Sequence, residues 1–192
     1  MASSPAPAAH TQSRRLDRSR AALLVVDLQE KLLPSIWERA RVVRESVRLI
    51  QGISFLGLPI LVTEQYRHGL GPTVAEVASV LPDFNPVQKL EFSGCTPEIL
   101  DRLRSRNLTD VVLCGIESHV CVTQTALDLL DTGFRVFPAA EACSSRTAEN
   151  WRAGLDRMQT AGAVPVSVEM VLFELLGRAG TEEFKRILGL VK

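Results

Sequence analysis

The feature that most constrains the fold is an alternation, from Ala21 onward, of short apolar runs with longer segments of helical period. Each short run is nearly continuous in aliphatic residues, as is typical of strands buried on both faces. The longer segments repeat their apolar positions every three or four residues, as amphipathic helices do. This alternation predicts an α/β fold: a three-layer αβα sandwich with a central, mostly parallel, six-stranded Rossmann-like sheet. The six expected strands are Ala22–Asp27, Pro59–Thr63, a short one near Gln88, Asp110–Gly115, Arg135–Ala139 and Ala163–Val168.

The length and composition of the chain fit one folded domain. With 192 residues and 46% hydrophobic content, the chain is long enough to bury a full core. No apolar run approaches the roughly 20 residues that span a bilayer. Residues 1–20 are rich in Ala, Ser, Pro and Arg, and we expect a disordered N-terminal tail there, followed by a single domain over residues 21–192. A transit peptide is a weaker interpretation of this basic segment.

The charge balance and the cysteine count exclude several classes of protein. Lys and Arg together number 22, as do Asp and Glu, so no net charge favours nucleic acid or a membrane as partner. The four cysteines form no C-x-x-C pair, which favours a reducing cytoplasm over a disulfide framework. Neither G-x-G-x-x-G after a strand nor G-x-x-x-x-G-K-[ST] occurs, so we expect no nucleotide cofactor.

The expected topology selects candidate site residues by their position. In open parallel sheets, ligands bind outside the carboxyl ends of the strands. The residues that follow the expected strands are Asp27, Glu64–His68, Lys89 and Glu117–Cys121. They include a carboxylate, an ammonium group and a thiol, which together suit nucleophilic catalysis by cysteine.

Each of the three groups has a chemical task in such a site. Cys121 lies at the expected start of a helix, where unpaired N–H groups and the helix dipole favour thiolate over thiol. Asp27 can accept the thiol proton and later assist an attacking water, while Lys89 can hold Asp27 and stabilise negative charge. Backbone N–H groups between Glu117 and Cys121 can receive an oxyanion. The implied reaction is acyl transfer to cysteine, followed by hydrolysis.

Each residue taken alone also has a purely structural interpretation. Asp27 could cap the following segment, and Lys89 could be a solvated lysine on an edge strand. Cys121 could be a small buried hydrophobe, as most free cysteines are. The co-location of all three at the ends of three strands is what favours catalysis.

Several blocks of the chain, in order and spacing, resemble the isochorismatase-like hydrolase superfamily of cysteine hydrolases, and most of all its isochorismatase domain-containing subgroup. The resemblance covers about Arg20 to the C-terminus. The blocks are LLVVDLQEKLLP (Leu23–Pro34), TEQY (Thr63–Tyr66), GLGPT (Gly69–Thr73), KLEFS (Lys89–Ser93), CGIESHVC (Cys114–Cys121) and ACSSR (Ala142–Arg146).

The resemblance implies a catalytic triad of Asp27, Lys89 and Cys121, the same residues that strand position selects. It further implies a cis peptide bond between Ile116 and Glu117, an oxyanion hole made by the backbone N–H groups of Glu117 and Cys121, and a homo-oligomer. The Asp-x-His of metal-binding relatives is replaced here by Glu64, Gln65 and Tyr66, so no metal site is expected.

Members that act on isochorismate lack the cysteine, so hydrolysis of a C–N bond in an amide-like small molecule is the favoured reaction. A hydrolase of another bond, including an isochorismatase-type reaction, and a catalytically idle binding or assembly member are the alternatives.

Five further residues are weaker candidates for the substrate pocket: Gln29, Tyr66, Leu70, Phe92 and His119. The aromatic residues could equally belong to the core or to a lid, and His119 could equally point to solvent. Whether the loop from Gln65 to Thr73 closes over the site is left open.

Overall fold

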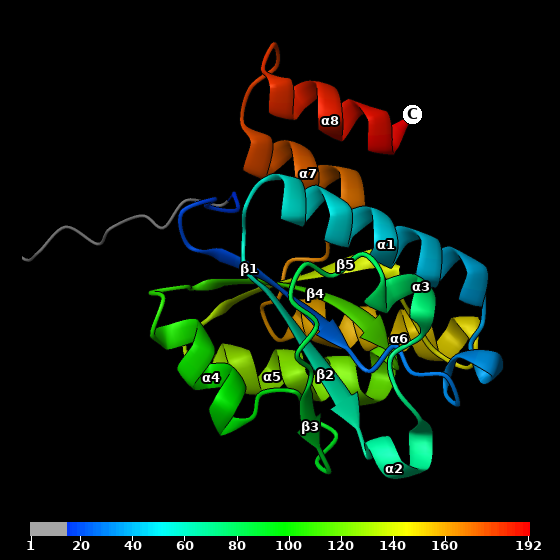
Figure 1. Ribbon diagram of the computed structural model, residues 1–192. Helices are drawn as coiled ribbons and strands as arrows, with labels where there is room; N and C mark the ends of the chain where they lie inside the picture. Colours follow the sequence, from blue (N-terminus) through cyan, green and yellow to red (C-terminus); the bar gives the residue numbers. More distant parts are fainter. Residues whose placement is uncertain (1–14) are drawn as a thin grey trace, which may run out of the picture.

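The computed structural model describes residues 15–192, and these residues form three layers around one parallel sheet (Figure 1). The sheet has five strands in the order β3-β2-β1-β4-β5, and every neighbouring pair is parallel. The strands are β1 (Ala21–Val26), β2 (Ile60–Gln65), β3 (Val87–Lys89), β4 (Asp110–Ile116) and β5 (Arg135–Ser144). The α/β class, the parallel sheet and the layered architecture agree with the sequence-based expectation.

Strand order places the end of β1 at the centre of the sheet edge. The chain adds β2 and β3 on one side of β1 and then returns to add β4 and β5 on the other side. The connections therefore diverge between β1 and β4, which is the topological switch point where such sheets bind ligands. Every residue of β1 and β4 is buried, because each strand has a neighbour on both sides and helices over both faces.

Helices cover both faces of the sheet. On one face, α1 (Arg39–Phe55) and α7 (Val168–Leu176) lie against the strands, and α8 (Glu182–Val191) packs outside them (Figure 1). On the other face lie α4 (Pro97–Arg104), α5 (Thr123–Asp131) and α6 (Ala148–Thr160). Short segments complete the fold at the loops: η1 (Leu33–Ser35), α2 (Arg67–Leu70), α3 (Ala75–Ala78) and the π-helical turn η2 (Ser118–Val122).

The sixth expected strand, Ala163–Val168, is not a strand. This segment runs beside β5, but its only bridge is a parallel one between Ala139 and Val166. Val164 and Val166 donate to the carbonyls of Val136 and Pro138, and Ala140 donates to the Val166 carbonyl. Pro138 of β5 has no N–H with which to return a bond to this segment, and Ser167 already caps the first turn of α7 through the Met170 N–H. The expected six-stranded sheet is therefore wrong by one strand.

The folded part of the chain begins before residue 21. Leu16 is buried, and its N–H donates to Glu174 of α7. Arg18 pairs with Glu183 of α8 at 2.7 Å and donates to the Leu56 carbonyl. Residues 15–20 are thus part of the domain rather than of the expected tail, while residues 1–14 of that tail lie outside the described residues. No helix within residues 15–192 has the length and apolar content needed to cross a bilayer.

Candidate active site

The structure brings Asp27, Lys89 and Cys121 together at the carboxyl edge of the sheet. Asp27 directly follows β1, Lys89 is the last residue of β3, and Cys121 lies in η2 just after β4. The Lys89 ammonium nitrogen is 2.6 Å from a carboxylate oxygen of Asp27, and both side chains are fully buried. Cys121 is 6% exposed. Three groups of different chemistry therefore meet, buried, at one point of the sheet edge.

Asp27 is held by partners on two neighbouring strands. One carboxylate oxygen accepts the Lys89 bond, and the other accepts a 2.8 Å bond from the Thr63 hydroxyl at the end of β2. The backbone of Asp27 is left-handed, with φ of 51°, a conformation that Asp tolerates better than most residues. Burial raises the pKa of the Asp27 carboxyl, while the Lys89 charge and the hydrogen bonds oppose this rise. Asp27 is thus a fixed carboxylate with a raised affinity for a proton.

Lys89 is fixed by several hydrogen-bond acceptors. One of them is Gln65, to which the sequence alone assigned no role. Its ammonium group donates to Gln65 Oε1 at 2.8 Å and to the carbonyls of Phe92 and Glu91 at 3.0 and 3.2 Å. Gln65 is fixed in turn, because its amide nitrogen donates to the Leu90 carbonyl at 2.6 Å. Gln65 belongs to the residues that follow the second strand, so its position could be found from sequence, whereas its contact with Lys89 could not.

The turn that carries Cys121, Glu117–Val122, has an unusual backbone, and we call it the Cys121 turn. The peptide bond between Ile116 and Glu117 is cis, and residues 118–122 form one turn of π-helix, a conformation frequent at functional sites. A hydrogen bond from the Glu117 backbone to the Cys121 side chain favours the thiolate. The Glu117 backbone therefore lies close to the sulfur.

The Cys121 thiol is protonated in the resting site, contrary to the expectation from the helix start. Burial and the negative charge of Asp27 raise the pKa of the thiol to about 12. Lys89 and the Glu117 backbone act in the opposite direction but do not outweigh them. The reason is that loss of solvation costs a buried thiolate more than nearby dipoles return. A thiolate can form here by transfer of the proton to Asp27.

Two weaker pocket candidates, Gln29 and His119, have fixed partners. Gln29 is fully buried and exchanges three hydrogen bonds of 2.6 to 2.9 Å with the backbone of Gln65 and Gly71. Its side chain therefore secures the 65–71 loop. His119 is partly exposed, and its Nδ1 lies 3.0 Å from the Ser145 hydroxyl.

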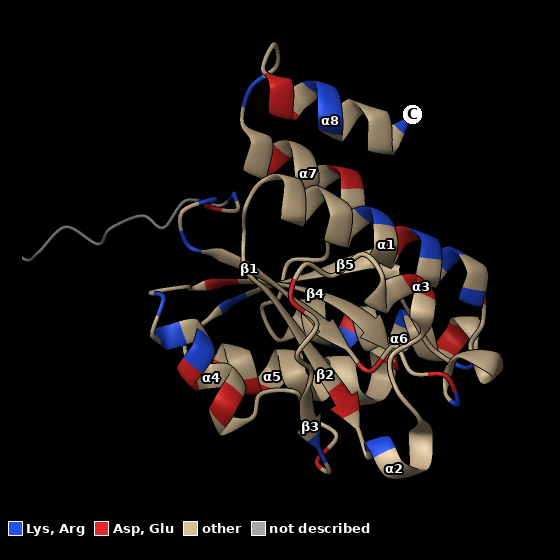
Figure 2. Cartoon of the chain, in the orientation of Figure 1, with Lys and Arg blue, Asp and Glu red and all other residues tan. Residues whose placement is uncertain are grey.

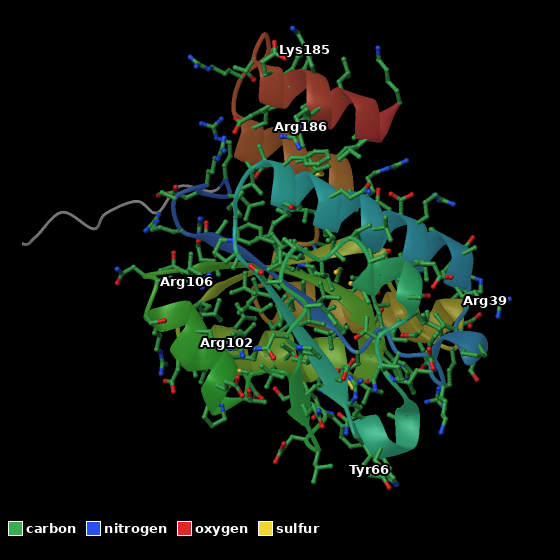
Figure 3. All side chains as sticks on the ribbon, in the orientation of Figure 1. Arg39, Tyr66, Arg102, Arg106, Lys185 and Arg186 are labelled. Carbon is green, nitrogen blue, oxygen red and sulfur yellow. The ribbon has the colours of Figure 1, made fainter. Side chains whose placement is uncertain are left out.

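The apolar pocket candidates lie toward the surface. Tyr66 is 51% exposed and Phe92 is 55% exposed, while Leu70 is half-buried in α2. Tyr66 projects outward beside α2 (Figure 3) and, with Lys89, lines a groove of about 420 Å³. Tyr66 thus borders the Lys89 side of the site.

The loop from Gln65 to Thr73 is tied down along its length. The buried carboxylate of Glu64 accepts hydrogen bonds from both the N–H and the hydroxyl of Thr73, at 2.7 and 2.9 Å. Lys31 donates to the Gly69 carbonyl at 2.9 Å through its side chain. Within residues 15–192, no three His, Cys, Asp or Glu side chains gather as a set of metal ligands, and His68 stays exposed in this loop.

Known proteins of one family are similar to this chain in sequence and in structure. The model of the Isochorismatase domain matches residues 21–170. Isochorismatase domain-containing protein 2 of Xenopus laevis is 40% identical over 174 residues, which cover 90% of this chain and 84% of the relative. The solved structure of the MAR1 ribonuclease from Caenorhabditis elegans matches with a TM-score of 0.88 at 36% identity, covering 92% of each chain. YcaC from Pseudomonas aeruginosa, solved with hexane-2,5-diol and covalent acrylamide, matches with a TM-score of 0.84 at 25% identity, covering 92% of this chain and 91% of that one.

Proposed function

This chain belongs to the isochorismatase family, and we propose that it hydrolyses a C–N bond of an amide-like small molecule, with Cys121 as nucleophile and without a metal ion. The observation that carries the proposal is the fully buried Lys89–Asp27 pair beside the Cys121 thiol. A buried ion pair contributes little net stability compared with an apolar pair of the same volume. Its retention next to a thiol, at the ligand-binding edge of the sheet, supports a chemical role.

The proposed reaction has two halves. First, the thiol proton moves to Asp27 while Sγ attacks the amide carbon, and the Asp27 proton then passes to the departing nitrogen as the C–N bond breaks. A thioester on Cys121 and a free amine remain. Second, Asp27 takes a proton from water as the water oxygen attacks the thioester carbon. The C–S bond breaks, the acid is released and Cys121 regains its proton.

The remaining groups position or stabilise charge in this scheme. Lys89 keeps the Asp27 carboxylate in place and offsets the negative charge of the thiolate. The backbone N–H groups of Glu117 and Cys121 would donate to the oxyanion of each tetrahedral intermediate. The closeness of the Glu117 backbone to the sulfur supports this assignment.

The YcaC structure gives the proposal independent support. That protein was solved with covalent acrylamide, and acrylamide is an electrophile that reacts with nucleophilic side chains such as a thiolate. A reactive nucleophile in a relative of this fold is consistent with the role proposed for Cys121. Hydrolysis of a bond other than C–N, and a catalytically idle binding role, are the alternatives that the experiment must separate.

Incubation with a panel of small amides tests the proposal. A second set of small molecules, with hydrolysable bonds other than C–N, is tested beside it. We expect wild type to release amine and to show an acyl adduct on Cys121 by intact mass when the reaction is quenched. Cys121→Ala should lose turnover and adduct together, while the half-buried Cys95→Ala control keeps both. Turnover that survives Cys121→Ala would sink nucleophilic catalysis, and activity confined to the other bonds would favour the alternative hydrolase. A chelator should leave the rate unchanged.

RNA serves as a further substrate control, because the MAR1 relative is named a ribonuclease. This chain has 22 basic and 22 acidic residues, and positions of both signs of charge are spread over the described elements (Figure 2). Such a chain lacks the net cationic excess that holds a polyanion. We therefore expect no cleavage of RNA.

We also propose that the protein forms a homo-oligomer in the cytoplasm. Leu90 and Phe92, beside Lys89, are 72% and 55% exposed, and large exposed apolar side chains next to each other are typical of interfaces. All four cysteines are free, as is usual in a reducing compartment. Light scattering after size exclusion should give a mass above one chain, and Leu90→Glu with Phe92→Glu should reduce it. A monomer at working concentration would contradict the oligomer.

A further inference from the structure

Strand β5 carries a large irregularity in its pairing with β4 just before it reaches the candidate site. The register pairs Leu113 with Pro138 and then Gly115 with Cys143. Residues 139–142 of β5 therefore stand opposite the single β4 residue Cys114, and we call them the β5 bulge. Bulges leave backbone groups without ladder partners, and they are frequent next to active sites, where they re-aim the chain.

Side chains from two helices take up the carbonyls in and beside the β5 bulge. Arg41 of α1 donates through Nη1 to the carbonyl of Glu141 and, at 3.5 Å, to that of Cys143. Ser46, also from α1, donates to the Ala142 carbonyl at 3.4 Å, and Trp151 of α6 donates to the Ala140 carbonyl at 3.1 Å. Arg41 is the one of these side chains that spans two carbonyls and carries a charge.

The guanidinium of Arg41 lies beside two tryptophans that contact each other. Its carbon is 5.3 Å from the ring centroid of Trp37 and 5.5 Å from that of Trp151, and the two rings are 5.5 Å apart. The side chain is 17% exposed, and its Nη2 is buried without a hydrogen-bond partner among the described residues. Burying a cation with one donor unsatisfied is unfavourable. The charge is partly offset by Glu38, whose carboxylate accepts a 2.7 Å bond from Arg41 Nε. The same guanidinium gives charge-assisted hydrogen bonds to the carbonyls of Glu141 and Cys143, which a neutral apolar side chain cannot give.

The chain that leaves the β5 bulge runs directly against the Cys121 turn. Ser144 pairs with Ile116, and its carbonyl accepts a 2.9 Å bond from the Ser118 hydroxyl. Ser145 contacts His119 through its hydroxyl at 3.0 Å. On the opposite side, the backbone of Trp37 makes two hydrogen bonds. Its N–H donates to the Ser145 carbonyl at 2.9 Å, and its carbonyl accepts from the Ser144 hydroxyl at 2.6 Å. Ser144 and Ser145 are therefore held between the segment that leads into α1 and the Cys121 turn.

We propose that Arg41 is a positioning residue for Cys121: by fixing the β5 bulge it sets where Ser144 and Ser145 meet the Cys121 turn. This inference rests on the proposed function, because it assigns Arg41 a role in presenting the Cys121 sulfur and the Glu117 N–H. Arg41 contacts neither group and acts through Ser144 and Ser145. Its matched control is Arg44, which lies on the same helix with a side chain that is 61% exposed.

The test measures alkylation of two cysteines in one molecule by iodoacetamide, across pH, with the labelled residue located by mass. Cys121 reports the site, and Cys95 serves as internal reference. We expect Arg41→Met to lower the Cys121 rate about tenfold and to move its pH profile upward, with Cys95 unchanged. Arg41→Lys should restore part of the rate because it keeps the cation, and Arg44→Met should match wild type.

The outcomes separate the two proposals. If wild-type Cys121 is not alkylated at any pH and forms no acyl adduct in the amide panel, the proposed function fails and the role of Arg41 fails with it. If wild-type Cys121 is reactive and Arg41→Met leaves its rate and pH profile unchanged, only the Arg41 inference is overturned. A rise at both cysteines would show general loosening and would also overturn it. Should Arg41→Met not fold, Arg41→Lys against Arg44→Lys makes the same comparison.

Discussion

Asp27 and Cys121 compete for one proton, and Lys89 decides which of them carries the negative charge. Burial raises the pKa of both acids. Lys89 forms its ion pair with Asp27 at 2.6 Å, so in the resting site the charge stays on oxygen and the proton on sulfur. The Asp27 charge is also one of the causes that raise the pKa of the thiol.

Asp27→Asn should therefore separate thiolate formation from catalysis. Removing the carboxylate leaves Lys89 beside the sulfur, so the pKa of Cys121 should fall and its alkylation near neutral pH should become faster. Turnover should nevertheless drop by about 10² to 10⁴-fold, because no group remains to carry the proton to the leaving nitrogen. Alkylation rates against pH and amide turnover measure the two effects. The exposed Asp83→Asn is the control, and slower alkylation in Asp27→Asn would contradict the assigned electrostatics.

Lys89→Met should destabilise the fold as well as the site. Removing one partner of a buried ion pair leaves an uncompensated charge, which costs about 3 to 5 kcal/mol. Urea unfolding near pH 7 measures this loss, and Lys185→Met, at a side chain that is 68% exposed in α8, is the control. The double variant Asp27→Asn with Lys89→Met should recover much of the stability, since no unpaired charge then remains. A loss below about 1 kcal/mol in Lys89→Met would mean that solvent or rearrangement compensates Asp27.

At the scale of single residues, sequence position predicted which candidate groups the sheet edge brings together, but not how burial and hydrogen bonds change their pKa values. Asp27, Lys89 and Cys121 could be found because each follows a recognisable strand. The contact of Gln65 with Lys89 depends on the pairing of β2 with β3, which no local pattern encodes. The raised pKa of Cys121 depends on burial, and that dominates the helix-start effect considered from sequence alone.

At the scale of elements, the Cys121 turn depends on the close approach of α6. A Cβ added at Gly154 would lie 2.7 Å from the backbone carbon and oxygen of Ser118 and 2.8 Å from the nitrogen of His119. These neighbours are backbone atoms, so the contact can be relieved only by moving a whole element. Gly154 thus lets α6 support the turn that presents Cys121.

Gly154→Ala should reduce Cys121 reactivity through this displacement. We expect a loss of about 1 to 3 kcal/mol in unfolding free energy from overpacking, together with slower alkylation of Cys121 and unchanged alkylation of Cys95. The matched control is Gly189→Ala in α8, where an added Cβ meets nothing within 4 Å. That control should gain about 0.5 to 1 kcal/mol, because alanine is the better helix former. Equal behaviour of the two variants would remove the assigned role of the α6 contact.

The sequence predicted helices and strands correctly where the apolar pattern alone determines the element. It failed where contacts with distant parts of the chain determine it. β1 and β4 are continuous apolar runs and form strands as expected. The segment Ala163–Val168 is equally apolar, yet it forms only part of a ladder, because Pro138 of β5 cannot donate to it and Ser167 caps α7. The β5 bulge carries no sequence signal of its own, because its carbonyls are satisfied by Arg41, Ser46 and Trp151 from distant parts of the chain.

At the scale of the whole molecule, the sheet buries thiols on its strands as well as at the site. Burial raises the pKa of Cys121 and Cys143 from 9.0 to about 12, and raises that of Cys114 as well. A folded-state pKa above the unfolded value means that each thiol stabilises the fold fully below the ordinary pKa. That contribution is lost as the pH rises toward the folded-state value. Between about pH 9 and about pH 12, each such thiol should lower the unfolding free energy by about 1.4 kcal/mol per pH unit.

The protein should therefore lose stability steeply on the alkaline side, and single thiols should account for measurable shares of the loss. Urea unfolding in reductant at about pH 8 and about pH 10 gives the change in the free energy of unfolding between these two pH values for wild type. In Cys143→Ala that change should be smaller by about 1.4 kcal/mol, because one buried thiol no longer ionises on unfolding. Any constant cost of the lost sulfur cancels in the difference between the two pH values, and the exposed Ser79→Ala should reproduce wild type. If Cys143→Ala shows the full wild-type change, other groups cause the alkaline loss, and Cys143 must already be able to ionise in the folded protein.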